Sequence, residues 1–167
     1  MRVGIAGYGV VGKTRHRSIE SNTSYQVTAI SESSEKARKS IPEGMTVYND
    51  YKTLIASAEL DVIFISLPNQ FAAEAACLSL QNGLHVFCEK PPARTHAELL
   101  EVEKQSLKFP ELKLMYGFNH RFHLSVEEAK LLIDSNSLGR LINMKGVYGK
   151  SQMISFNQTD WRTDREA

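Results

Sequence analysis

The chain has 167 residues, which corresponds to about one domain and is long enough to bury a core without disulfide bonds. Hydrophobic residues make up 42% of it and charged residues 23%, proportions typical of a globular protein. With 20 Lys and Arg against 19 Asp and Glu, the formal charge is only +1, which argues against a nucleic-acid binder or a polybasic membrane protein.

Cysteines, histidines and apolar runs narrow the chemistry and the location. Cys77 and Cys88 by themselves can form neither a disulfide framework nor a structural zinc site. His120 and His123 have no evident third ligand nearby, so no metal is expected. The longest apolar run, over residues 61–67, is too short to cross a membrane, and the N-terminus lacks a signal-peptide pattern. We therefore expect a cytoplasmic protein with no membrane or nucleic-acid partner.

Short apolar runs alternate with helical patterns over most of the chain. The expected strands cover residues 3–6, 25–31, 46–48, 61–66, 85–88 and 113–116. The expected helices cover residues 11–21, 35–40, 51–58, 71–81 and 95–108, the last with Thr95 as its cap and Glu98 completing a capping box. This alternation predicts an α/β fold, a doubly wound parallel sheet with right-handed connections.

The pattern changes after the sixth expected strand. A longer helix is expected over residues 124–134, and then a strand over residues 141–148 that no helix follows. We interpret residues 1–120 as one domain and residues 121–167 as the beginning of a second α/β domain that the chain does not complete. Because an unpaired apolar strand tends to pair with another copy, we expect a homo-oligomer.

A glycine-rich turn lies between the first strand and the first helix. Its residues are Gly7, Tyr8, Gly9, Val10, Val11 and Gly12. In this spacing the first glycine permits a tight turn, the second lets the backbone approach a pyrophosphate, and the third lets the helix pack close to the strand. The helix N-terminus presents unpaired N–H groups to the phosphates. A simple tight turn is the alternative, but the strand–turn–helix context favours a dinucleotide-binding Rossmann domain over residues 1–120.

The end of the second strand bears on the choice between NAD and NADP. Dinucleotide-binding units usually place an acidic residue there to bind the adenosine ribose, and here the position holds Ser31 with Glu32 beside it. Ser31 can donate to a 2′-phosphate, whereas Glu32 would repel it. Lys36 and Arg38 can add positive charge, although a solvated helix face is the simpler interpretation of both. The choice stays open, with a slight lean to NADP.

The fourth strand ends in a second loop at the same edge of the sheet. Leu67, Pro68 and Asn69 either line the cofactor there or only terminate the strand. His16 lies on the first helix near the glycine turn, and a plain surface histidine is an equal interpretation of it.

The fifth strand ends in the loop of Glu89, Lys90 and Pro91. A lysine at a strand's carboxyl end can bind a substrate hydroxyl or carbonyl, as an acid or as an electrostatic stabiliser. An exposed Glu–Lys pair before a proline turn is the alternative, and Lys90–Pro91 is a candidate for a cis bond. With three loops at one edge, the functional interpretation is favoured, with Lys90 as the catalytic candidate.

The order of these motifs resembles the Gfo/Idh/MocA oxidoreductases, a family that includes glucose–fructose oxidoreductase and inositol 2-dehydrogenase. The resemblance covers essentially the whole chain, through the glycine turn, Pro68-Asn69, and Glu89-Lys90-Pro91 as its most specific element. Family members are longer. They join an N-terminal Rossmann domain to a C-terminal α/β domain whose open, mostly antiparallel sheet binds substrate and often mediates oligomerisation.

The resemblance implies roles for residues in both parts of the chain. Lys90 would touch the substrate hydroxyl that is oxidised, with Pro91 near the nicotinamide and Glu89 near its ribose. The implied substrate-binding residues of the second part are Asn119 and Arg121, from the family's Asn-x-Arg segment, and the later pair Trp161 and Arg162. For Arg121 a salt bridge at a helix end is an equal interpretation.

Three departures from the family pattern stand out. Ser31 replaces the acidic residue that many members carry, and residues 71–73 replace a histidine often found after Pro-Asn. The glycine-rich segment whose Asp and His transfer the proton would begin where the chain ends.

The resemblance therefore implies an NAD(P)-dependent oxidoreductase, a dehydrogenase acting on a hydroxyl of a sugar, cyclitol or sugar nucleotide. The chain itself is expected to be a cofactor-binding fragment that turns over little of this small polyhydroxylated substrate. Two other classes stay open: a non-catalytic NAD(P)-sensing regulatory module, and a different Rossmann enzyme, against which the Glu-Lys-Pro turn argues.

Overall fold

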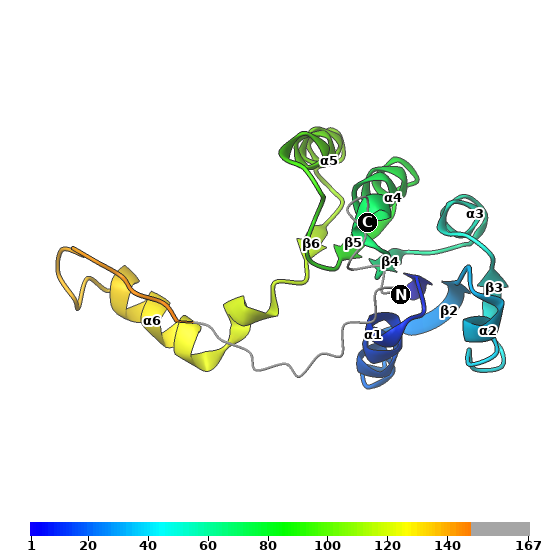
Figure 1. Ribbon diagram of the computed structural model, residues 1–167, viewed down its shortest axis with the longest axis horizontal. Helices are drawn as coiled ribbons and strands as arrows, with labels where there is room; N and C mark the ends of the chain where they lie inside the picture. Colours follow the sequence, from blue (N-terminus) through cyan, green and yellow to red (C-terminus); the bar gives the residue numbers. More distant parts are fainter. Residues whose placement is uncertain (148–167) are drawn as a thin grey trace, which may run out of the picture. The chain divides into compact units, whose positions relative to one another are not determined.

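The computed structural model describes residues 1–147, which divide into a first unit, Met1–Gly117, and a second unit that begins at Phe118. The first unit contains a six-stranded parallel sheet between two layers of helices (Figure 1). Its strands are β1 (Arg2–Ala6), β2 (Gln26–Ser31), β3 (Thr46–Tyr48), β4 (Val62–Ile65), β5 (His85–Cys88) and β6 (Leu114–Tyr116).

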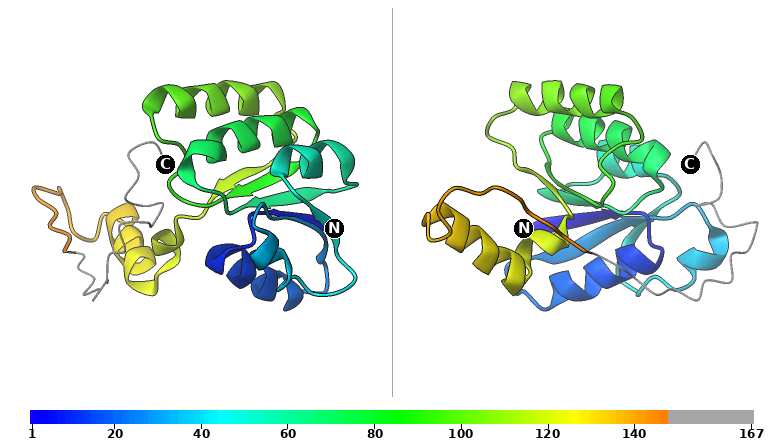
Figure 2. Two further views of the ribbon diagram at one scale, coloured as in Figure 1. Left: turned by 45° about the vertical axis from the view of Figure 1, so that its right-hand side comes forward. Right: turned by 60° about the vertical axis from the view of Figure 1, so that its left-hand side comes forward.

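The strand order is β3-β2-β1-β4-β5-β6, so the direction of winding reverses between β1 and β4. One face of the sheet is covered by α1 (Val10–Glu20) and α2 (Glu35–Arg38). The other face, as Figure 2 shows, is covered by α3 (Tyr51–Ser57), α4 (Asn69–Gln81) and α5 (His96–Lys108). The predicted doubly wound parallel sheet is therefore confirmed, strand by strand.

The core lies on both faces of the central strands, because alternate side chains of a strand point to opposite layers. On β1, Val3 and Ile5 belong to the buried cluster that contains Ile19 of α1. Ala6 belongs to the larger cluster that contains Leu80 of α4. Strands buried on both faces read as continuous apolar runs, which is why their sequences are recognisable.

The helix ends follow local signals. Gly83, after α4, has a φ of +76°, the left-handed conformation that favours glycine at a C-terminus. At the start of α5, the Thr95 hydroxyl accepts a hydrogen bond from the Glu98 N–H at 3.2 Å, as predicted. The Glu98 carboxylate, however, accepts from the backbone N–H and guanidinium of Arg94 rather than completing the predicted capping box at Thr95.

The cap of α3 makes part of the stability depend on pH. The Asp50 carboxylate accepts from the Thr53 N–H at 2.8 Å and from the Thr53 hydroxyl at 2.7 Å. These bonds, chiefly the backbone one, hold the pKa of Asp50 below its usual value. Because the lowered pKa belongs to the folded state, the stabilisation is complete above the unfolded pKa and is lost as the pH falls through the folded one.

We expect Asp50→Ala to lower the free energy of unfolding at neutral pH by about 1 kcal/mol and to make its decline in acid less steep. Asp50→Asn keeps a side-chain oxygen for the cap and should cost less than the alanine. Urea unfolding at neutral and acidic pH measures both effects. An Asp50→Ala variant as stable as the wild type at neutral pH would show that the cap does not contribute.

The second unit contains a short 3₁₀ helix, η1 (Asn119–Phe122), and α6 (Leu124–Asp134). The predicted strand at 141–148 is wrong over its described part, because residues 141–147 form neither helix nor strand. Leu141 and Val147 are 49% and 87% exposed, and a strand without a neighbour has no partner for its backbone hydrogen bonds. The homo-oligomer inferred from that strand stays a prediction. Within residues 1–147, the helices are all too short or too polar to span a membrane.

Candidate functional site

The carboxyl ends of the strands lie in one row, which brings the predicted loops together. Ala6 of β1 pairs with Ile65 of β4, and Ile65 pairs in turn with Cys88 of β5. One residue further on, the ladder continues: the Ser66 N–H donates to the Ala6 carbonyl at 2.8 Å, and the Glu89 N–H donates to the Ile65 carbonyl at 2.9 Å. The glycine turn and the loops after β4 and β5 therefore leave the sheet side by side.

The glycine turn has the shape that a dinucleotide pyrophosphate needs. Gly7 has a φ of +87°, and a Cβ there would lie 2.6 Å from the Ser66 carbonyl oxygen. A Cβ on Gly12 would lie 2.1 Å from the Gly7 oxygen, so α1 can approach β1 only because Gly12 has no side chain. Nothing stands within 4 Å of the place where a Cβ on Gly9 would project.

The start of α1 is electrostatically suited to an anion. Gly9 is the N-cap, no side chain caps the helix, and its first turn contains no acidic residue. The N–H groups and the positive end of the helix dipole are thus available to phosphate. The first two helical residues, Val10 and Val11, are exposed. The residues present fit the pyrophosphate of NAD or NADP.

The acidic side chain next to the turn is Glu32, not a residue of β2 itself. Ser31, the last residue of β2, is 2% exposed. The Glu32 carboxylate accepts from the Tyr8 N–H in the glycine turn and from the Ser34 N–H, both at 2.9 Å. Arg38 donates to the backbone carbonyls of Glu32 and Ser33, so it braces this loop.

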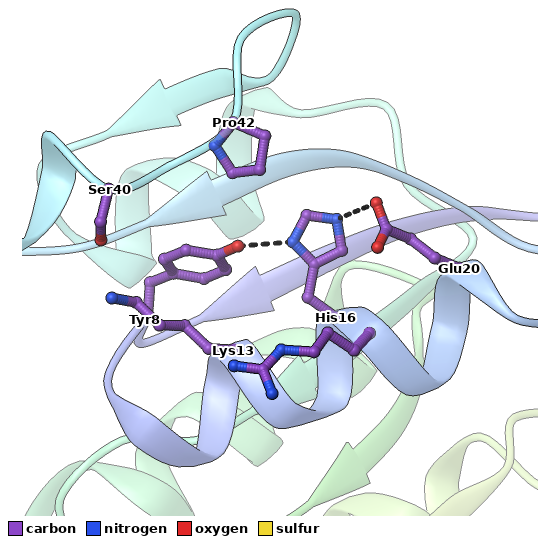
Figure 3. Close-up of a pocket in the computed structure, with 7 residues that line it drawn as sticks. Tyr8, Lys13, His16, Glu20, Ser40 and Pro42 are labelled. Carbon is purple, nitrogen blue, oxygen red and sulfur yellow. Dashed lines mark hydrogen bonds and ion pairs between the residues drawn. The ribbon is translucent and has the colours of Figure 1, made fainter.

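The side chains of Tyr8, from the glycine turn, and His16, from α1, lie between α1 and the segment that follows α2 (Figure 3). The Tyr8 hydroxyl and His16 Nδ1 are 2.6 Å apart, and His16 Nε2 lies 3.4 Å from a Glu20 oxygen. They border a cavity of about 240 Å³ that is also lined by Lys13, Arg17, Ser40 and Pro42. His16 is 3% exposed, so the interpretation of a plain surface histidine is wrong; it supports the turn from behind.

This pair predicts a measurable contribution to stability. Burial, with the Glu20 charge second, raises the pKa of Tyr8, so its phenol is neutral at ordinary pH. Tyr8→Phe leaves the buried His16 Nδ1 without its partner, and we expect the free energy of unfolding to fall by about 1–3 kcal/mol. Tyr25→Phe, at an exposed tyrosine, is the control. Chemical denaturation compares the two, and equal stability of Tyr8→Phe and the wild type would contradict the role given to the pair.

The loop after β4 both terminates the strand and starts a helix. Pro68 is the N-cap of α4, and its carbonyl accepts from the Phe71 N–H at 3.0 Å. Helix α4 begins at Asn69, two residues earlier than predicted. The Leu67 side chain packs on the core and comes within 3.3 Å of the Cβ position of Gly7, so the two loops touch.

The loop after β5 holds the lysine predicted to be catalytic. The Lys90–Pro91 peptide is cis, and Lys90 and Pro91 are exposed. Within the described residues, the Lys90 amine makes no hydrogen bond or ion pair. Glu89, in contrast, is paired with Arg15 of α1, whose Nε donates to Glu89 Oε1 at 2.6 Å.

Cys88 is the last residue of β5, whereas His120 and His123 belong to the second unit. Cys88 is fully buried, and burial raises the pKa of its thiol to about 12, as a small buried hydrophobe would show. The rings of His120 and His123 stack at 4.8 Å, and residues 1–147 contain no cluster of three metal-ligating side chains. Two of the predicted substrate-binding residues, Asn119 and Arg121, lie on η1 in the second unit; Trp161 and Arg162 lie outside the described residues.

Two features of this edge were not predicted from the sequence: the Arg15–Glu89 pair and the position of Gly117. Arg15 and Glu89 are 74 positions apart, and no local pattern links them. Gly117 follows β6, and a Cβ there would come within 3.0 Å of Glu89 Oε2. Gly117 directly follows the last residue of β6, and Glu89 directly follows the last residue of β5; this shared position at the strand ends was the signal that the sequence offered.

A glycine turn at a helix N-terminus, beside the point where the strand order reverses, defines a dinucleotide-binding domain of the Rossmann class. The comparison with known families agrees. The model of the Gfo/Idh/MocA oxidoreductase family, with its NAD-binding Rossmann fold, matches residues 1–117. The chain belongs to this family.

Characterised relatives include D-glucoside 3-dehydrogenase of Escherichia coli, 28% identical over 84% of this chain and 41% of the relative. Inositol 2-dehydrogenase of Salmonella typhimurium is 27% identical over 87% of this chain and 45% of the relative. The structure of scyllo-inositol dehydrogenase from Lactobacillus casei with NAD(H) and scyllo-inositol bound has a TM-score of 0.75 at 27% identity, over 83% of this chain and 42% of that one. The chain thus spans less than half the length of these relatives.

Proposed function

We propose that the protein is an NAD(P)-dependent dehydrogenase that oxidises a hydroxyl of a small polyhydroxylated compound, a sugar or cyclitol. The main support for this function is the alignment of the strand ends. It places the glycine turn, at the uncapped start of α1, beside the loop of Glu89, Lys90 and Pro91. The names of the relatives, inositol and glucoside dehydrogenases, support the substrate class. Residues from 121 on would begin the part that binds this substrate.

Different loops of the edge would bind different parts of the dinucleotide. The N–H groups around Gly9 would bind the pyrophosphate, with Val10 and Val11 beside it, and Leu67, Pro68 and Asn69 would line the next stretch. Glu89 would lie at the nicotinamide ribose and Pro91 near the nicotinamide. The bound cofactor supplies the hydride chemistry.

Lys90 would handle the reacting hydroxyl. Its exposed amine has no partner among the described residues, so it is available to hydrogen-bond the substrate oxygen and to stabilise the negative charge that develops there. Asn119, Arg121, Trp161 and Arg162 would bind the other hydroxyls of the substrate. A polyol offers several donors and acceptors, which such polar side chains match.

For the cofactor, the geometry favours NAD over the NADP to which the sequence leans. The Glu32 carboxylate is fixed by two backbone N–H groups next to the glycine turn, where it can accept from the two ribose hydroxyls. A 2′-phosphate at that place would face a fixed negative charge. Ser31 is too deeply buried to offer its hydroxyl, and Arg38 is already engaged with backbone carbonyls.

The test combines binding with turnover. Because the chain spans less than half of its relatives, we expect residues 1–167 to bind NADH, seen as a change in nicotinamide fluorescence, and to oxidise myo-inositol, scyllo-inositol or a glucoside only at background rates. Turnover at a typical enzymatic rate, about 10 per second, would contradict the second expectation. Absence of NADH binding would contradict the proposed function itself.

A further inference from the structure

A single arginine joins the helix that starts at the glycine turn to the loop that carries the lysine. Arg15 extends from the second turn of α1, and both its Nε and its Nη2 contact Glu89 Oε1. The guanidinium lies over the Phe87 ring of β5, 5.1 Å from the ring centre, and Phe87 in turn stacks on Phe64 of β4 at 4.9 Å. An arginine held by a carboxylate and an aromatic face has few other conformations to adopt.

The carboxylate is confined from the other side by Gly117. A Cβ at Gly117 would lie 3.0 Å from Glu89 Oε2 and 3.2 Å from Glu89 Cδ, so the carboxylate uses the space that a side chain would fill. The backbone N–H of Gly117 donates to the Cys88 carbonyl at 2.8 Å, which fixes the distance between the two loops. Glu89 is thereby held between α1 and the end of β6, with its side chain 15% exposed.

This pairing leaves the neighbouring lysine available. Glu89 and Lys90 are adjacent, and an unpaired carboxylate would attract the amine beside it. Since Arg15 is paired with Glu89, the Lys90 amine has no partner among residues 1–147.

A lysine in place of Arg15 would replace the planar guanidinium by a single point charge. It would pair less specifically with Glu89 and would stack less well on Phe87.

We propose that Arg15 is a positioning residue for the loop after β5. It fixes Glu89 where the nicotinamide half of the cofactor would bind, and it keeps Lys90 free for substrate. This rests on the proposed function, since it assigns Glu89 and Lys90 the places given there. It adds a role for a residue of α1 that lies outside the glycine turn.

The first test compares NADH with ADP, which lacks the nicotinamide half. Calorimetric titrations of the chain would use Arg15→Gln, Arg15→Lys and Gly117→Ala, with Arg17→Gln as the control because Arg17 is an exposed cation on the same helix. We expect Arg15→Gln and Gly117→Ala to weaken NADH about tenfold and to leave ADP within about twofold. Arg15→Lys should recover part of the NADH affinity, and Arg17→Gln should change neither ligand.

An equal loss of NADH and ADP affinity in Arg15→Gln would mean that Arg15 only supports the fold, and would overturn the inference. So would unchanged NADH binding. Melting temperatures of each variant identify any that is poorly folded. If Arg15→Gln is one of these, Arg15→Met, which keeps an unbranched side chain next to Phe87 and removes the charge, replaces it with the same expected pattern.

The second test does not depend on the cofactor. Acetylation of the Lys90 amine by a small active ester is followed by mass spectrometry, relative to the exposed Lys36. In Arg15→Gln, Glu89 is released to pair with Lys90, and we expect the relative rate to fall about threefold. An unchanged rate would overturn the inference while the proposed function stands, whereas failure of the wild type to bind NADH would overturn the proposed function.

Discussion

Gly9→Ala should abolish most cofactor binding without destabilising the protein, whereas Gly12→Ala should impair both. At Gly9 a methyl group meets no protein atom within 4 Å, so its cost is confined to the space where the pyrophosphate would approach. At Gly12 the same methyl group would lie 2.1 Å from the Gly7 carbonyl oxygen. Because that oxygen belongs to the backbone, α1 must move away from β1 to relieve the contact.

We expect Gly9→Ala to weaken NADH at least about 30-fold with an unchanged melting temperature. For Gly12→Ala we expect a loss of about 3 kcal/mol in the free energy of unfolding, at the upper end for overpacking. Calorimetric titration and urea unfolding of both variants measure the two effects separately. Normal NADH affinity in a folded Gly9→Ala variant would show that the pyrophosphate does not bind at this turn.

Glu32→Gln should change the preference between the two cofactors. The carboxylate can accept from both hydroxyls of the adenosine ribose and repels a 2′-phosphate, while the amide can do neither fully. We expect NADH to bind more weakly and NADPH more tightly, so that the ratio of their dissociation constants shifts about 100-fold. Competition titrations of the two cofactors measure this ratio.

Glu35→Gln provides the matched control, because Glu35 lies three residues away, is exposed, and begins α2. Its ratio should equal that of the wild type. If Glu32→Gln also leaves the ratio unchanged, the ribose does not contact Glu32, and the preference for NAD proposed from the geometry is wrong.

Local sequence patterns were sufficient for the sheet and for most of the edge. Strands such as β1 and β4 are buried on both faces, so their apolar runs are unambiguous, and a glycine turn between strand and helix has few other uses. Parallel strands also place their carboxyl ends at one edge by necessity. The meeting of the loops after β1, β4 and β5 was therefore predictable without coordinates.

The features that the sequence left open, missed or predicted wrongly are those that depend on a shift of one residue along a strand or on a partner far away in the chain. The sequence offered both Ser31 and Glu32 at the end of β2. Successive residues of a strand face opposite sides, and it is the Glu32 carboxylate that accepts from the glycine turn, while Ser31 is buried. The Arg15–Glu89 pair joins residues 74 positions apart. The strand predicted over residues 141–148 had suitable apolar residues but no neighbour to pair with among the described residues.

Above all, this chain is expected to bind a nicotinamide dinucleotide at the shared edge of β1, β4 and β5. Calorimetric titration with NADH and NADPH, separately and at matched ionic strength, tests it most directly. We predict saturable binding with one site per chain and the tighter affinity for NADH. Absence of binding by either cofactor to the folded chain would contradict the claim, and a tighter affinity for NADPH would contradict the role of Glu32 alone.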